Sequence, residues 1–186
     1  MVIDTHTHAY FDELAAKESE VLSNMDKNGV SFAVQIGCDA ESSLKAVELA
    51  KRHPNAYRAT VGLHPGEAQN MSEKEVRQEL SEIRRILIEN REWVVAIGET
   101  GWDFYRLSDD PAARETEIEN QRTAFETQAA LAKEFGLPLV IHTRNSGQAL
   151  LESLEEFSIS KAVVHCFSED LAFARQAMSI SDGIMF

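Results

Sequence analysis

The amino-terminal segment places two histidines where a strand could present them to a metal ion. His6 and His8 lie one residue apart in MVIDTHTHAY, directly after an apolar start. Because alternate residues of a strand share a face, Asp4, His6 and His8 would form one column. Neutral imidazoles are good ligands for divalent zinc, iron, nickel or manganese. Taken alone, a hydrogen-bonded pair of histidines in a turn would also explain the spacing.

Three further side chains of metal-ligand type follow apolar runs elsewhere in the chain. Glu99 follows WVVAIG, His142 follows PLVI and His165 follows KAVV. The carboxyl ends of parallel strands meet at one end of a barrel, where barrels of this kind keep their chemistry. Residues from four separate strands would then converge. The chain therefore predicts one shared metal site, built from His6, His8, Glu99, His142 and His165.

Three polar residues near these strand ends are candidates for substrate contacts. His64, in VGLHPGE, precedes a proline turn, so contact with substrate and stabilisation of the turn are both open. We expect Asp103 and Arg144 in loops at the mouth of the barrel. Arg144 could hold a phosphate oxygen through a forked hydrogen bond, and Asp103 could orient a ligand histidine. An exposed loop charge is the alternative for each.

One recurring pattern would position these residues: a short apolar run, a turn and an amphipathic helix. The apolar runs predict parallel strands buried on both faces, near residues 1–4, 32–37, 57–63, 93–98, 137–142, 161–167 and 183–186. Helical spacing predicts helices near residues 12–28, 41–53, 72–91, 114–136, 146–157 and 169–180. No GxGxxG or P-loop motif follows the first strand, so a nucleotide-binding doubly wound sheet has no support. The predicted fold class is α/β, a TIM (β/α)8-type barrel.

The length limits how much of a barrel the chain can form. A chain of 186 residues suits one domain, whereas a closed (β/α)8 barrel takes about 250 residues. The last apolar run, GIMF, begins a seventh strand. We therefore expect residues 1–186 to form a single barrel domain, truncated after about six to seven β/α units with the C-terminal units missing.

The composition limits the classes of binding partner and the cellular compartment that we expect. The net charge is −13, from 18 basic and 31 acidic residues, which disfavours a protein that coats nucleic acid through basic patches. An enzyme that meets phosphate through bound cations stays possible. No apolar run reaches bilayer length, no signal peptide is recognisable, and Cys38 and Cys166 form no CxxC motif. We expect a cytoplasmic protein with reduced thiols, Cys166 packed in the core, no membrane contact and no obligate protein partner.

Five segments taken together resemble the TatD-related metal-dependent hydrolases, within the amidohydrolase-like barrels. They are IDTHTH, VGLHP, IGETGWD, LPLVIHTR and VVHCFS, in the order of the family. The resemblance implies two divalent ions (zinc, manganese, magnesium, iron or nickel), bound by His6, His8, Glu99, His142 and His165. It implies that Glu99 bridges the two ions and takes part in catalysis. It also implies substrate contacts for His64, Asp103 and Arg144.

The same resemblance implies a reaction and a substrate. The reaction is cleavage of phosphodiester bonds in DNA from strand ends, by water that two metal ions activate, and a small phosphoester is a further possible substrate. Members of the family also carry a metal-binding Asp in a T-D-x-P segment, and the chain contains no such segment. The alternatives are an amidohydrolase-type enzyme acting on amides, lactones or phosphotriesters, and an inactive truncated barrel that serves as a scaffold.

Overall fold

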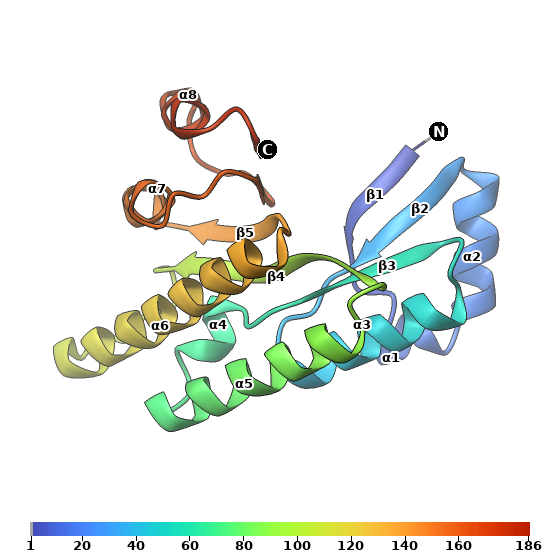
Figure 1. The fold of residues 1–186 in the computed structure, drawn as a ribbon, viewed down its shortest axis with the longest axis horizontal. Helices are drawn as coiled ribbons and strands as arrows, with labels where there is room; N and C mark the ends of the chain where they lie inside the picture. The colour runs from blue at the N-terminus through green and yellow to red at the C-terminus, as the bar shows by residue number, and fades with distance from the viewer. Residues whose placement is uncertain (1) are drawn as a thin grey trace.

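The computed structural model describes residues 2–186, which form a curled sheet of seven parallel strands with helices along its outer face (Figure 1). The strands pair in chain order, and every neighbouring pair is parallel. They are β1 (Val2–Thr7), β2 (Val30–Gln35), β3 (Tyr57–Val61), β4 (Val94–Asp103), β5 (Leu139–Arg144), β6 (Ala162–Val164) and β7 (Ile184–Met185). The predicted α/β fold of TIM-barrel type is confirmed, as a half-barrel.

Helices connect the strands close to where the sequence predicts them. They are α1 (Asp12–Ala15), α2 (Glu18–Lys27), α3 (Ala40–Arg52), α4 (Pro65–Ala68), α5 (Glu73–Glu89), α6 (Pro111–Phe135), α7 (Gly147–Glu156) and α8 (Leu171–Ile180). The predicted helix over 12–28 is two helices, and the short α4 was not predicted. Helix α6 begins early because the Asp110 side chain accepts from Ala113 N at 2.9 Å and Pro111 suits the first helical position. Within residues 2–186, none of these helices combines the length and the apolar surface that a bilayer span requires.

Helix α5 illustrates how the outer layer packs. Its apolar residues recur at helical spacing, and Val76, Leu80, Ile83 and Leu87 are all buried. The helix contacts α3, α6 and β3. The apolar face of α5 therefore supports β3, the strand that leads into His64.

Strands β1 and β7 are the two edges of the sheet. Val2 and Ile3 of β1 are 54% and 55% exposed, and Met185 of β7 is 62% exposed. Within residues 2–186 each of these strands pairs with a neighbour on one side only. The prediction that all strands are buried on both faces is therefore wrong for β1 and β7.

The carboxyl ends of three strands differ from the prediction. Strand β6 ends at Val164, so His165 and Cys166 lie in a turn. Cys166 is exposed with a φ of +48°, so its predicted place in the core is wrong. Strands β4 and β5 instead continue to Asp103 and Arg144, which are paired across the two strands. Their predicted loop positions are wrong, because the pairing carries both strands past their apolar runs.

Gln128 of α6 ties the helical layer to the strand ends. Its Nε2 donates to the Leu63 carbonyl at 3.0 Å and to Thr100 Oγ1 at 2.8 Å. Its Oε1 accepts from Leu63 N at 2.8 Å, and the side chain is fully buried. Because Leu63 directly precedes His64, this amide holds the backbone from which His64 projects.

We expect Gln128→Met to lower the free energy of unfolding by about 2–3 kcal/mol, because the buried N–H and C=O of Leu63 lose their partners. Methionine has a similar length, so the change mainly removes hydrogen bonds. Urea denaturation measures the difference. Gln148→Met, on an exposed face of α7, is the matched control and should change stability by less than about 0.5 kcal/mol. Equal stability of Gln128→Met and the wild type would show that packing alone holds α6 here.

Candidate metal centre

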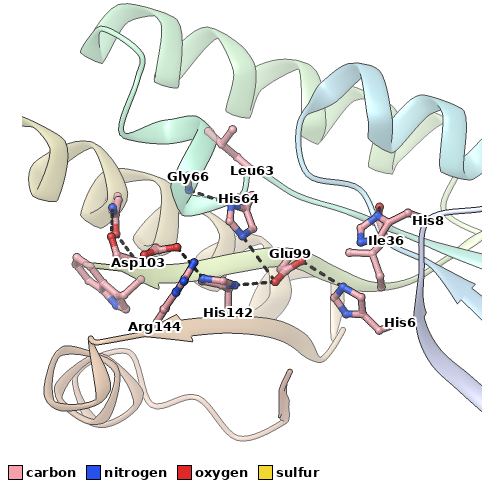
Figure 2. Close-up of polar contacts among 12 residues, drawn as sticks. His6, His8, Ile36, Leu63, His64, Gly66, Glu99, Asp103, His142 and Arg144 are labelled. Atoms are coloured by element: carbon pink, nitrogen blue, oxygen red, sulfur yellow. Dashed lines mark hydrogen bonds and ion pairs between the residues drawn. The ribbon is translucent and has the colours of Figure 1, made fainter. Parts of the chain in front are cut away.

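Glu99 lies at the centre of a group of histidines at the carboxyl ends of the strands (Figure 2). Its Oε2 is 3.3 Å from Nε2 of His6 in β1, and its Oε1 is 3.1 Å from Nδ1 of His142 in β5. Nε2 of His64, just beyond β3, is 3.8 Å from Oε1. Side chains that are far apart in the sequence therefore share one carboxylate.

An irregularity in β4 places the Glu99 side chain at this position. The regular pairing of β4 with β5 is interrupted between Ile97 and Thr100. Within the interruption, Glu99 N donates to the Gly37 carbonyl at 2.8 Å, and Gly98 has a φ of +146°, a conformation that favours glycine. Bulges of this kind re-aim strand side chains. The Glu99 side chain consequently turns towards the strand ends.

The Glu99 carboxylate is buried and yet charged. The residue is 4% exposed, and burial by itself would raise the pKa of the carboxyl. Hydrogen bonds from His142 and His6, together with the nearby His64, outweigh burial and hold this pKa well below its usual range. The centre of the cluster therefore carries a negative charge at neutral pH.

His142 contacts a carboxylate at each of its ring nitrogens. Nδ1 is 3.1 Å from Glu99 Oε1, and Nε2 is 3.1 Å from Asp103 Oδ2. Burial would lower the pKa of His142, but the two carboxylates raise it above its ordinary value. Asp103 is itself buried, and its Oδ1 accepts from Tyr105 N at 2.9 Å. The anchored Asp103 carboxylate thereby sets the orientation of the His142 ring.

His8 is held from the side opposite the cluster. Its Nδ1 lies 3.1 Å from the Ile36 carbonyl and 3.1 Å from the Tyr10 hydroxyl, which itself donates to that carbonyl at 2.6 Å. Because a carbonyl only accepts, the ring proton is on Nδ1 and the lone pair is on Nε2. Burial and the nearby His6 lower the pKa of His8, which favours this neutral form. Sequence reasoning missed Tyr10, although its position two residues after His8 could have indicated it.

The residues present fit a divalent cation. His6, His8 and Glu99 each offer a ligand atom, and these atoms lie within 4.8 Å of one another; His64, Glu99 and His142 form a second such group. Nδ1 of His6 is buried without a hydrogen-bond partner among residues 2–186, although buried polar atoms are normally paired. Imidazole and carboxylate donors suit zinc, iron, nickel and manganese. Glu99 belongs to both groups and lies between His6 and His142, so two adjacent ions could share it.

His165 lies beside these two groups. Its ring stacks on His6, with the centroids 3.3 Å apart and the planes within 10° of parallel. Burial and the nearby His6 lower its pKa, so the neutral ring is favoured. The structure brings four of the five predicted ligands into the two groups, namely His6, His8, Glu99 and His142, and it places His165 against His6.

His64 occupies a turn and also faces the cluster. Its Nδ1 accepts from Gly66 N at 2.9 Å and caps the first turn of α4, so the predicted stabilisation of the turn is confirmed. Burial lowers the pKa of His64 to about 4. The neutral ring carries its proton on Nε2, because Nδ1 is the acceptor. This N–H faces the Glu99 carboxylate, where a substrate oxygen could also receive it.

In protein stripped of metal, we expect the His64 ring to stay neutral from pH 8 down to about pH 5. Its pKa is about 4 in the folded state, against an ordinary value of 6.5. The unfolded chain therefore takes up this proton first, and the contribution of His64 to stability falls between pH 6.5 and about pH 4. The C2–H proton resonance of His64, assigned by its loss in His64→Asn, reports the titration. A midpoint near 6.5 would contradict the burial argument.

Comparison with known proteins identifies the family. Residues 3–186 match the sequence profile described as TatD related DNase. An uncharacterized metal-dependent hydrolase of Mycoplasma genitalium is 30% identical over 180 residues, which cover 96% of this chain and 64% of that protein. A 3'-5' ssDNA/RNA exonuclease TatD of Erwinia tasmaniensis is 34% identical over 158 residues, which cover 84% of this chain and 56% of that protein.

Solved structures agree with the sequence comparison. The crystal structure of YjjV, a TatD homolog of Escherichia coli, matches with a TM-score of 0.83 and 29% identity over 98% of this chain and 65% of that one. A TatD family hydrolase of Entamoeba histolytica matches with a TM-score of 0.80 and 25% identity, covering 96% of this chain and 62% of that one. The chain thus spans 56% to 65% of the length of these four proteins. It belongs to the TatD-related DNase family.

Proposed function

We propose that the protein is a metal-dependent hydrolase that cleaves phosphodiester bonds in DNA from a strand end, with two divalent ions. The single observation that carries the proposal is the position of Glu99, whose carboxylate lies between the proposed ligands His6 on one side and His142 on the other. The proposed ligands are His6, His8, Glu99, His142 and His165. The His6 ring supports the proposal, because its Nε2 faces Glu99 and no residue of 2–186 forms a hydrogen bond with its buried Nδ1, so no other protein group holds either nitrogen.

Divalent ions bound there would polarise a phosphoryl group and lower the pKa of water near it. The surrounding side chains orient the ligands and the substrate. Asp103 accepts from one nitrogen of His142 and thereby directs the other nitrogen towards Glu99. His64 offers an N–H on Nε2, and Arg144 offers a planar fork of donors that matches phosphate oxygens.

The proposed substrate follows from charge and from the names of relatives. TatD proteins of Erwinia tasmaniensis and Yersinia pseudotuberculosis carry the name 3'-5' ssDNA/RNA exonuclease. A net charge of −13 suits an enzyme that grips a few nucleotides at a cationic centre, rather than one that coats a duplex. We therefore favour the end of a single DNA strand as the substrate. We also propose that the protein works in the cytoplasm. A small phosphoester would fit the same site.

Asp103 should support metal affinity without contacting the ions. We expect Asp103→Asn to weaken manganese binding by roughly 10- to 100-fold, because histidine ligands depend on the group that orients them. Isothermal titration calorimetry measures the affinity. Asp109→Asn makes the same change of charge at an exposed position of the following loop and should leave affinity unchanged. Equal affinity of Asp103→Asn and the wild type would contradict the proposed orientation of His142.

Turnover distinguishes the reaction classes. With manganese, we expect cleavage of single-stranded DNA and of an aryl phosphodiester, and neither amide nor lactone hydrolysis. Glu99→Gln should lower kcat/KM by at least about 100-fold, because Glu99 is a proposed ligand of the ions and not only a group that orients a ligand. Glu115→Gln, at an exposed position of α6, should leave kcat/KM unchanged.

Robust lactone hydrolysis without DNA cleavage would overturn the nuclease assignment. If the protein bound metal but turned over none of these substrates, the result would contradict the proposed hydrolase and would support an inactive scaffold that binds metal.

A further inference from the structure

Arg144 is an arginine without an acidic partner in a strongly acidic chain. Five other arginines each contact a carboxylate, namely Arg52, Arg77, Arg84, Arg85 and Arg122. The Arg144 guanidinium has no hydrogen bond or ion pair with any residue of 2–186, and it lies over the aromatic ring of Tyr105. Arg106, Arg114 and Arg175 also lack such partners but are exposed. The half-buried Arg58 donates to backbone carbonyls. Among residues 2–186, Arg144 is therefore the half-buried arginine whose guanidinium makes no hydrogen bond, which suggests a ligand outside the protein.

Arg144 follows His142 by two residues in β5, towards the carboxyl end of the strand. Residues two apart in a strand share a face and are separated by roughly 6.6 Å along it. Arg144 and His142 are two apart in β5, and Asp103, which pairs with Arg144 across the two strands, contacts His142 (Figure 2). A phosphate near the proposed ions would therefore lie within reach of the Arg144 fork.

Tyr105 supplies the surface on which this guanidinium rests. The Arg144 Cζ lies 3.6 Å from the centroid of the Tyr105 ring. Tyr105 directly follows Phe104 beyond the end of β4, and its N–H donates to Asp103, the residue that contacts His142. The Tyr105 side chain is nevertheless 56% exposed. It lies in the turn after β4 and not on either of the edge strands β1 and β7.

We propose that Tyr105 and Arg144 form a nucleoside subsite next to the metal cluster. The Arg144 fork binds the phosphate and the exposed part of the Tyr105 ring stacks against the neighbouring base. Stacking on an aromatic ring tolerates every base, and a guanidinium fork matches phosphate. The subsite would thus select nucleotides over other phosphoesters without selecting a sequence. This inference rests on the proposed phosphodiesterase function.

Phe11 is the competing aromatic surface, and its surroundings argue against it. It is 53% exposed, and its ring lies parallel to that of His8 at 5.0 Å. It borders a hollow of about 620 Å³ whose walls also carry four acidic side chains, those of Asp12, Glu13, Asp39 and Glu41. The one basic side chain there, Lys45, is already paired with Glu41. A phosphate attached to a base on Phe11 would meet repulsion, whereas one attached to a base on Tyr105 meets Arg144.

Binding to the manganese-loaded protein tests the subsite without requiring turnover. The probes are deoxyadenosine monophosphate, 2-deoxyribose 5-phosphate and inorganic phosphate, measured by calorimetry. We expect the wild type to bind the nucleotide about 5- to 10-fold more tightly than the sugar phosphate, the lower end of what base stacking contributes. Tyr105→Leu should abolish that difference, because it removes the ring that stacks on the base, while Tyr105→Phe should keep the difference. Arg144→Gln should weaken all three ligands by a similar factor.

Three results would overturn the subsite. One is equal binding of nucleotide and sugar phosphate by the wild type. Another is an equal loss for both ligands in Tyr105→Leu, which would mean that the ring only positions Arg144. The third is loss of the base-dependent gain in Phe11→Leu rather than in Tyr105→Leu. Failure of DNA cleavage with the base-dependent gain intact would instead overturn the proposed reaction and retain the nucleotide site.

Discussion

The site depends on one buried charge, the carboxylate of Glu99. Burying a carboxylate is costly unless hydrogen bonds and opposite charge compensate for it. His6 and His142 provide that compensation from β1 and β5, on either side of β4. The carboxylate reaches them because the pairing of β4 is interrupted and Glu99 N bonds to the Gly37 carbonyl. A local departure from regular strand geometry therefore determines where the histidines can meet.

Three histidines of the cluster are oriented by a partner that is not itself a candidate ligand. Asp103 holds His142, the Ile36 carbonyl holds His8, and the Gly66 N–H holds His64. These contacts determine which ring nitrogen carries the proton and which faces the cluster. His6 differs, because its Nδ1 has no such partner among residues 2–186 and its ring is packed against His165. His6 thus presents Nε2 to Glu99 and leaves its buried Nδ1 without a hydrogen bond to any described residue.

The distribution of charge is consistent with recognition of an anion at one place. Most of the molecule repels polyanions, since acidic residues outnumber basic ones by 31 to 18. At the carboxyl ends of the strands, half-buried histidines surround a carboxylate, and Arg144 rests on Tyr105 without an acidic partner. Attraction of a phosphate would then be local and would depend on bound cations, which are the largest charges in such a site.

The order of the strands and helices and the residue types at the strand ends could be predicted from the sequence, because both follow from local periodicity and from residues that directly follow apolar runs. Asp103 and Arg144 could not be placed correctly from it, since pairing between two strands distant in sequence extends both past their apolar segments. The sequence also could not predict the direction of the Glu99 side chain or the contact of Tyr10 with His8. The contact of Tyr105 with Arg144 was likewise not predictable. Each of these depends on distances between segments that only the curled sheet brings together.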